Sequence, residues 1–489
     1  MTAPRKPGVP CARSRYDAVI VGSGPNGLAA AIELARTGLS TLVVEARDTA
    51  GGGTRTRELT LPGFLHDVCS TVHPLGFASP FFQELRLERF GLAWVHPPAP
   101  LVHVMDDGTG VALERSVEAT AANLGEDGPA YRRLIEPLAG RFTELLPMVL
   151  AGMRLPHKPL LFARFGVAAL QSMEGLARRT FRGTLASALL AGISAHSMVP
   201  LDHLATASFG LVLATAGHAV GWPIASGGSR AIVDALVNCL QAHGGEVVTG
   251  FPVEHIDQLP EARAYLFDVA PRHLVAIAGD RLSARYRKSV LAMRHGPGIF
   301  KMDWALRGPV PWRDPTCARA ATVHLSGTLA EVASAEAAAH AGTLASRPFV
   351  LFVQPTLFDP SRAPRGMHIA WAYCHVPHGS AIDASAAIEA QVERAAPGFG
   401  ALVVARHATD AQALAAYNPN FVGGDITGGS PDLRQLFFRP AVRLDPYATS
   451  ARDIYLCSAS TPPGGGVHGM CGYWAARSAL ARVFRHAPR

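Results

Sequence analysis

A glycine-rich turn near the start of the chain has the residue types and spacing to bind a dinucleotide. Gly22, Gly24 and Gly27 separate an apolar, β-branched stretch from an alanine-rich one. In such a pattern Gly22 permits a tight turn, Gly24 lets backbone approach a pyrophosphate, and Gly27 lets helix and strand pack closely. Glu45 ends the next apolar stretch, where a carboxylate can accept hydrogen bonds from a ribose. The acid disfavours a 2′-phosphate, so we expect FAD or NAD rather than NADP.

The apolar patterning around this turn predicts the elements that position it. Residues 16–21 alternate and are β-branched, which favours a strand, and Ala, Leu and Ile recur at helical spacing over residues 26–37. Gly38 is placed to end that helix, and residues 40–46 form a second strand pattern with Glu45 at its tip. Strand, turn, helix and strand in this order predict a nucleotide-binding βαβ unit.

Two further glycine runs lie at opposite ends of the sequence. Residues 51–53 lead to Arg55, and residues 464–466 precede a helical pattern over 467–484. One long cofactor that extends between the two loops would contact both of them, which favours FAD. The helix would offer unpaired N–H groups to the negative charge of a reduced flavin; a capped surface helix is the alternative. Arg55 could serve the flavin edge, a phosphate or the surface, and the sequence leaves all three open.

The residues expected to contact the cofactor share these loops and strand tips. They are Gly22, Gly24, Pro25, Asn26, Gly27, Glu45, Ala46, Arg47, Gly52, Gly53, Thr54, Ser460, Gly465, Gly466 and Val467.

Five internal stretches extend the pattern across the chain. They are "AGISAHS" (191–197), "GWPIASGGSRAIVDAL" (221–236), "GPGIFKMDWAL" (296–306), "WAYCHVPHG" (371–379) and "YNPNFVGGDITGG" (417–429). Together with the two ends, these stretches resemble the superfamily of flavin-dependent amine oxidases and phytoene desaturases, and within it the bacterial phytoene-dehydrogenase-related branch. The resemblance runs from about Tyr16 to the C-terminus.

The resemblance implies an α/β fold with two interleaved domains. One is an FAD-binding Rossmann-like domain of the glutathione-reductase and amine-oxidase type. The other is a substrate domain made of a mixed sheet and helices. The expected boundaries are a flexible tail over 1–14, the FAD domain over 15–80, 225–298 and 440–487, and the substrate domain over 81–224 and 299–439, with lid helices over 158–180.

The resemblance also implies particular contacts and shows two departures. Residues 244–256 read as a turn and hairpin, whose backbone near Val253 would meet the adenine. Where relatives often have a histidine before the last glycine run, this chain has Pro462, and His468 stands where a proline is common. FAD should still bind, although the substrate side of the flavin then differs.

Lys301 and Asp303 are the leading catalytic candidates. Lys301 lies in an apolar strand pattern, where a buried ammonium is costly, and Asp303 shares its strand face and could pair with it. The resemblance would place Lys301 near the flavin N5, reached through a water; a strand-edge lysine that extends to solvent is the alternative. Arg55 and His468 complete the set of catalytic candidates, with core packing as the alternative for the histidine.

Composition narrows the class of protein. The net charge is +7, but the basic residues are dispersed and not interleaved with aromatic residues, so we expect no nucleic-acid partner. The cysteines are scattered without a C-x-x-C pair, which indicates a reducing compartment and hence the cytoplasm. His375 and His378 are separated by Pro377 and lack an acidic neighbour, so we expect no metal site. Neither a signal peptide nor a membrane span is indicated, and homo-oligomerisation is left open.

The substrate side of the expected site is apolar. An apolar helical stripe runs through residues 158–179, with arginines at its borders. Such a helix suits core packing, a lid over an apolar tunnel, or transient contact with a membrane surface. No second G-x-G-x-x-G follows a strand, so the reductant is expected to be the substrate itself.

We therefore expect an FAD-dependent dehydrogenase or desaturase. Its substrate would be a lipophilic small molecule of the isoprenoid or polyene kind, with electrons passed to oxygen or a quinone. A flavin amine oxidase, a non-redox polyene isomerase and a flavin-free lipid-binding protein remain as alternatives.

Overall fold

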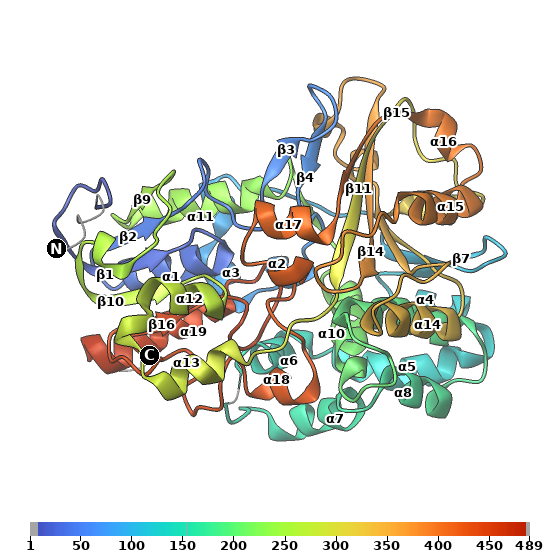
Figure 1. Cartoon of the computed structure of the whole chain (residues 1–489). Coiled ribbons are helices and arrows are strands. Elements are labelled where there is room, and N and C mark those ends of the chain that lie inside the picture. The colour runs from blue at the N-terminus through green and yellow to red at the C-terminus, as the bar shows by residue number, and fades with distance from the viewer. Residues whose placement is uncertain (1–7, 153, 486–489) are drawn as a thin grey trace.

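Two sheets divide the chain, as Figure 1 shows for the computed structural model, which describes residues 8–152 and 154–485. The first sheet has five parallel strands in the order β16 (Ile454–Leu456), β10 (Glu261–Phe267), β1 (Arg15–Val21), β2 (Thr41–Val44) and β9 (Glu246–Val248). Its strands are drawn from the beginning, middle and end of the sequence. All five fall within the three segments expected to form the FAD domain.

Helices cover both faces of the first sheet because its central strands are apolar on both sides. Ala18 and Ile20 of β1 face one core and Val19 and Val21 face the other. The first face is covered by α1 (Pro25–Ala35), α3 (Pro80–Leu85), α11 (Arg230–Ala242) and α19 (Met470–Ala479). The second face is covered by α12 (Pro271–Ala278) and α13 (Ala284–Leu291).

The second sheet is mixed and has seven strands. Their order is β15 (Val403–Thr409), β11 (Gly298–Leu306), β14 (His368–Val376), β13 (Val350–Val353), β12 (Ala320–Leu325), β6 (Ala99–Val104) and β7 (Gly110–Leu113). Only the β12–β6 pair is parallel. Two further short antiparallel pairs are β3 (Thr56–Glu58) with β4 (Leu65–Asp67), and β5 (Trp94–Val95) with β8 (Ile224–Ala225).

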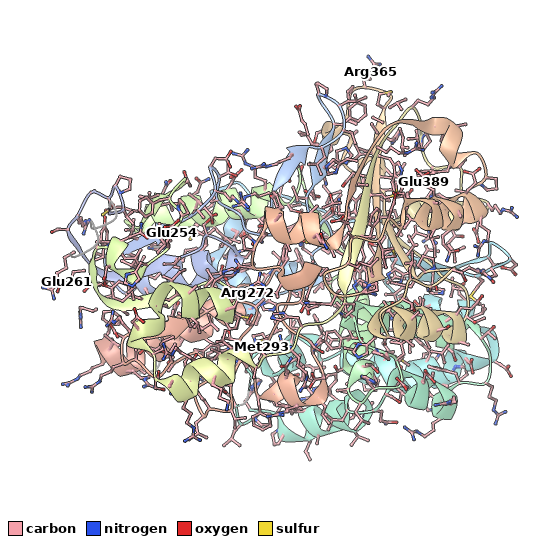
Figure 2. The ribbon with its side chains drawn as sticks, viewed as in Figure 1. Glu254, Glu261, Arg272, Met293, Arg365 and Glu389 are labelled. Atoms are coloured by element: carbon pink, nitrogen blue, oxygen red, sulfur yellow. The ribbon has the colours of Figure 1, made fainter. Side chains whose placement is uncertain are left out.

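Helices also sandwich the second sheet (Figure 1). One face packs on α4 (Val117–Asn123), α5 (Gly128–Ala139), α6 (Phe142–Val149), α7 (Pro159–Ala169), α8 (Met173–Thr180), α9 (Leu185–Ser194), α10 (Thr206–Ala219) and α14 (Leu329–His340). The outer face packs on α15 (Ser385–Ala395) and α16 (Phe399–Leu402). Figure 2 shows Glu389 of α15 on this outer side, where it accepts a hydrogen bond from Trp304 at 3.1 Å. α17 (Ala411–Tyr417) lies toward the first half, where Arg47 Nη2 donates to Ala416 O and Tyr417 O. The short helices α2 (Pro74–Phe77) and α18 (Leu433–Phe437) lie between the two halves.

Two local predictions were wrong. Within the expected tail, residues 8–14 are described and Val9 is buried, with its N–H donating to Gln258 O at 3.0 Å; residues 1–7 lie outside the described part. The expected hairpin over 244–256 is the single edge strand β9 followed by a loop. The loop backbone instead pairs with the segment after β2, through Phe251 N–H to Glu45 O at 2.9 Å, and Pro252 has no N–H to continue a strand.

The predicted lid helix and the predicted C-terminal helix both differ in their bounds from the helices of the structure. The stripe over residues 158–179 is buried as expected, but it lies on two helices because Leu170 O accepts from Ala205 N–H and Ser172 caps α8. The last helix begins at Met470 rather than Val467, since Gly469 before it has φ 69°. The glycine run therefore forms an extended loop ahead of the helix.

Candidate cofactor and substrate site

One cavity of ≈1170 Å³ joins the two halves of the molecule. This volume exceeds that of an ordinary single-ligand pocket, which is at most about 1,000 Å³. The cofactor-binding residues expected from sequence that border it are Gly22, Gly24, Pro25, Asn26, Glu45, Ala46, Arg47, Gly52, Gly53, Thr54, Val253, Ser460, Gly465, Gly466 and Val467. Gly27 lies behind the wall, where a Cβ would be 2.1 Å from Gly22 O, so its expected role in helix–strand packing is confirmed.

The glycine loops from both ends of the chain meet at this cavity. A Cβ on Gly52 would lie 3.0 Å from the Cα of Gly24, so the first two loops touch backbone to backbone. Gly51 N–H also donates to Ser23 O at 3.2 Å. The C-terminal loop reaches the same wall because α19 packs directly on α1.

Glu45 is buried at the tip of β2 and is held by three residues, one of them Arg47, whose N–H donates to Oε1 at 2.9 Å. Ser23 donates to its Oε2 from N–H at 3.0 Å and from Oγ at 2.6 Å, and Arg55 Nη2 donates to its Oε1 at 3.2 Å. Arg55 also donates to Gly52 O at 2.8 Å and to Thr49 O at 2.7 Å. The surface alternative for Arg55 is wrong, since the guanidinium is buried and ties the second glycine loop to the carboxylate.

Asp268 is a site residue that the sequence analysis missed. It follows β10, and its Oδ2 accepts from Gly27 N–H at 2.9 Å beneath the glycine turn. Burial, reinforced by the charge of Glu45, raises the pKa of Asp268 to about 7. The sequence signal that could have identified Asp268 is its position directly after a strand of the parallel sheet, because ligands bind at the carboxyl ends of such strands.

The C-terminal glycine loop packs against a second loop, which the sequence analysis included only among the stretches that carry the family resemblance. A Cβ on Gly465 would lie 2.9 Å from Thr427 O. Asp425, fully buried, fixes that loop by accepting from Thr427 N–H at 2.7 Å, from Gly429 N–H at 3.0 Å and from Gly296 N–H at 3.0 Å. The segment 425–429 thereby supports the glycine run at the cavity wall.

Arg439 is a buried cation beside the same loop and was also missed. Its Nε donates to Gln435 O at 3.0 Å and its Nη1 to Ala459 O at 3.2 Å, and within the described chain no carboxylate pairs with it. Nη1 lies 3.1 Å from where a Cβ on Gly464 would be. Burial lowers the pKa of Arg439, yet a guanidinium keeps its charge at neutral pH. Arg439 therefore contributes a buried positive charge to this part of the cavity wall.

His468 borders the cavity but is fixed by its neighbours. Its Nδ1 accepts from Met470 N–H at 3.1 Å, so the ring proton sits on Nε2, and burial lowers its pKa to about 4. A Cβ on Gly466 would be 2.9 Å from the ring. A neutral imidazole beneath the glycine loop is consistent both with core packing and with a role of His468 in the site.

Lys301 and Asp303 lie behind the cavity wall rather than on it. Strand alternation puts them on the cavity-facing side of β11, but the Trp371 ring covers the ammonium at 4.9 Å. The expected Lys301–Asp303 ion pair is confirmed, and the alternative of a strand-edge lysine that extends to solvent is wrong, because Lys301 is only 1% exposed. Although burial alone would raise it, the ammonium keeps the pKa of Asp303 below its usual value. Direct contact with the cofactor is thus not favoured for either residue.

The far part of the cavity is an apolar chamber between the second sheet and its helices. The side chains that line it are Met148, Phe162, Phe165, Ala169, Leu170, His196, Met198, Phe209, Val212, Leu213, Trp222, Ile299, Thr322, Leu351, Val353, Trp371 and Tyr373. The acidic residues on the cavity wall, Glu45, Glu254 and Asp268, belong to the glycine-rich end, where Figure 2 labels Glu254. In the described part of the chain, no group of three or more His, Cys, Asp or Glu side chains could hold a metal.

The residues at the glycine-rich end fit a dinucleotide. Two glycines line the approach at positions where a side chain would clash with neighbouring atoms. A buried acid lies at the expected ribose position, and Asn26 Oδ1 is buried on the wall without a hydrogen-bond partner. The family described as an NAD(P)-binding Rossmann-like domain matches residues 20–85, which include the turn and the acid.

Two curated relatives and one solved structure extend the comparison. Pyridine nucleotide-disulfide oxidoreductase domain-containing protein 2 of Rattus norvegicus is 26% identical, over 97% of this chain and 94% of that protein. A phytoene desaturase (lycopene-forming) of Paracoccus sp. is 25% identical, over 93% and 95%. The structure of putrescine oxidase bound to putrescine superposes with a TM-score of 0.62 at 17% identity, over 96% and 99%.

These comparisons support a flavin oxidoreductase superfamily. The expected fold is confirmed: a Rossmann-like domain combined with an amine-oxidase-type arrangement. For an oxidoreductase of this type, a flavin or nicotinamide cofactor is the occupant that the glycine-rich end suits.

Proposed function

We propose that the protein is an FAD-dependent dehydrogenase or desaturase that oxidises a C–H bond of a lipophilic, isoprenoid or polyene substrate. The observation that carries the proposal is the continuity of one cavity, from glycine loops at both ends of the chain to an apolar chamber. A cofactor held at one end would then share this cavity with a lipophilic substrate in the apolar chamber.

FAD is proposed over NAD because both ends of the chain contribute to the wall. Gly464–Gly466 and the buried cation Arg439 add a second part to the wall, from the C-terminal end of the chain, and this part suits the flavin ring. The chain also lacks a C-x-x-C pair through which a disulfide could exchange electrons.

Each group on the wall has a definite task in this proposal. When bound, FAD would accept a hydride, one hydrogen with two electrons, from the substrate C–H bond. The second hydrogen would leave the adjacent atom as a proton to water, and oxygen or a quinone would reoxidise the flavin. Gly24 admits the diphosphate, Glu45 accepts from the ribose, and Arg439 offsets negative charge on the ring. Trp371 and Tyr373 close the chamber against water, which favours hydride loss over side reactions.

An amine substrate is the second candidate, favoured by the fold shared with putrescine oxidase. A buried ammonium needs a carboxylate or an aromatic cage. Trp371 and Tyr373 both line the chamber, but their rings stack on each other, with centroids 6.0 Å apart and 14° between planes, and no acid lies near them on the wall. The lipophilic substrate is therefore preferred.

Contact with a lipid surface is proposed for the chamber end. Leu160 and Val167 of α7 are 87% and 74% exposed, while Phe162 and Phe165 of the same helix line the cavity. α7 thus joins the chamber to an exposed apolar surface. No helix in the described ranges is long and apolar enough to cross a bilayer.

The test begins with the cofactor. Purified protein is denatured and the released chromophore identified by chromatography; the proposal expects one FAD per chain. Anaerobic mixing with isoprenoids and with amines then shows which class bleaches the flavin. Bleaching by amines alone reverses the preference, and product of unchanged mass with the flavin still oxidised indicates an isomerase.

A further inference from the structure

Thr322 and His196 are polar side chains on the wall of the apolar chamber. Thr322 of β12 is 1% exposed and borders the cavity, and its Oγ1 has no hydrogen-bond partner. His196, in the turn after α9, borders the same cavity. An unpaired buried hydroxyl costs about 1–3 kcal/mol, so such a group is expected to meet a polar partner when the chamber is filled.

His196 is held by a second histidine from the sheet. Its Nε2 lies 3.2 Å from Nε2 of His324, so one nitrogen donates and the other accepts, and Nδ1 of His196 has no partner among the described residues. Trp222 packs edge-on against the His196 ring, with centroids 5.6 Å apart, and fixes its plane. Burial lowers the pKa of His196 to about 3, so the imidazole is neutral.

The sheet register places this pair at a defined distance from the cofactor end. Thr322 pairs with Val353, which in turn pairs with Trp371, so two interstrand spacings, roughly 10 Å, separate Thr322 from Trp371. Trp371 donates to Thr71 Oγ1 at 2.8 Å, in the segment that follows the second glycine loop. Thr322 therefore lies two strands away from Trp371, and His196 contacts His324, which lies two residues along β12 from Thr322.

The charge of the chamber restricts what this pair can bind. The acids on the wall all lie at the glycine-rich end, and neither Thr322 nor a neutral His196 compensates an ammonium or a carboxylate. Both can donate to or accept from an uncharged oxygen. The remaining wall is aliphatic and aromatic.

We propose that the substrate is a lipophilic molecule that carries one uncharged oxygen, a hydroxyl or carbonyl, and that Thr322 and His196 hold this oxygen about 10 Å from Trp371. The inference rests on the proposed function, which it narrows: a pure hydrocarbon would leave Thr322 unpaired. The oxygen anchors the molecule, while the oxidised C–H bond lies nearer the glycine loops.

The test compares three molecules with one carbon skeleton. Flavin-loaded protein is titrated anaerobically by calorimetry with farnesol, farnesylamine and the parent hydrocarbon 2,6,10-trimethyldodeca-2,6,10-triene. We expect farnesol to bind at least tenfold more tightly than either of the others, since a site that hydrogen-bonds an oxygen rejects analogues that lack it. Equal affinities for farnesol and the hydrocarbon, or tightest binding of the amine, overturn the inference.

Variants assign the preference to the pair. Thr322→Val keeps the shape and should weaken farnesol binding about tenfold while leaving the hydrocarbon unchanged; His196→Phe should act in the same direction. The matched control is Ser208→Ala, a hydroxyl on the same wall that already donates to Ala205 O at 2.7 Å, which should alter neither affinity. Equal weakening of both ligands by Thr322→Val overturns the assignment.

The two proposals fail in different ways. A protein that holds FAD and is bleached by the hydrocarbon, with no preference for farnesol, refutes the oxygen anchor alone. A protein that holds no flavin but prefers farnesol through Thr322 refutes the redox function alone.

Discussion

Gly472 of α19 lies directly against Asn26 of α1: a Cβ on Gly472 would be 1.7 Å from the carbonyl oxygen of Asn26. The two helices carry the glycine loops from opposite ends of the chain. Their close approach is what brings both loops to one cavity.

Gly472→Ala should therefore separate the two ends. We expect a loss of stability of at least about 1–3 kcal/mol and a lower FAD content, because neither backbone can yield without moving its helix. Thermal unfolding and the flavin-to-protein absorbance ratio measure both. Gly400→Ala, in exposed helix α16 with its nearest contact at 3.7 Å, is the control and should change neither. A Gly472→Ala protein with unchanged melting temperature would show that the contact is not tight.

Asp268 should make stability depend on pH. The folded protein keeps this proton up to about pH 7, whereas the unfolded chain releases it near 3.8. Between these values the folded state binds more protons, so the free energy of unfolding falls as pH rises, by about 4 kcal/mol at most. Asp268→Asn can still accept from Gly27, and it should remove this slope and stabilise the protein at pH 8.

Unfolding by urea from pH 4 to pH 8 measures that slope. The exposed Asp234 on α11 gives the control Asp234→Asn, which should retain the slope of the wild type. Parallel curves for Asp268→Asn and the wild type would refute the buried titration. Because it also removes charge beneath the glycine turn, Asp268→Asn should bind FAD more tightly at pH 8.

Arg439→Leu should lower the reduction potential of the bound flavin. A buried cation beside the C-terminal glycine loop stabilises the reduced, negatively charged ring, and its loss should shift the potential by about −30 mV or more, since 30 mV corresponds to about 1.4 kcal/mol for two electrons. Dye-coupled reduction measures the shift. Arg434→Leu, an exposed arginine on α18, should leave the potential unchanged. Equal reduction potentials for Arg439→Leu and the wild type would show that the charge of Arg439 does not stabilise the reduced flavin.

Lys301→Met should act on stability more than on chemistry. It leaves Asp303 buried without its cation, which costs about 3–5 kcal/mol, and Lys301→Met combined with Asp303→Leu should recover most of that loss. Stopped-flow rates of flavin reduction and reoxidation should stay within about twofold of the wild type. If either half-reaction slows strongly while stability is unchanged, Lys301 acts on the cofactor after all.

The exposed apolar face of α7 should bind lipid. Leu160→Asp combined with Val167→Asp should reduce flotation of the protein with phosphatidylglycerol-containing vesicles, without changing the binding of farnesol in detergent. Leu291→Asp, on the exposed face of α13 and 54% exposed in the wild type, is the matched control. Flotation equal in all three proteins would remove α7 from any membrane contact.

The sequence alone determined the parts of the protein whose geometry is local. Gly22, Gly24 and Gly27 require a turn of one shape, the alternation before them requires a strand, and Glu45 at the next strand tip follows from the same βαβ unit. These features depend on neighbouring residues, so spacing was enough to find them. The same holds for the buried stripe of α7 and α8.

Only the tertiary structure decided which distant side chains share the cavity. Asp268 and Arg439 carry no local motif, and they become site residues because separate segments fold around the first βαβ unit. Lys301 was a catalytic candidate because it lies in an apolar strand pattern and because of the family resemblance, but a ring from the adjacent strand, Trp371, covers it. Thr322 and His196 line one cavity because sheet register and helix packing place β12 beside the turn after α9. Such contacts arise from long-range packing, which residue spacing along the chain does not encode.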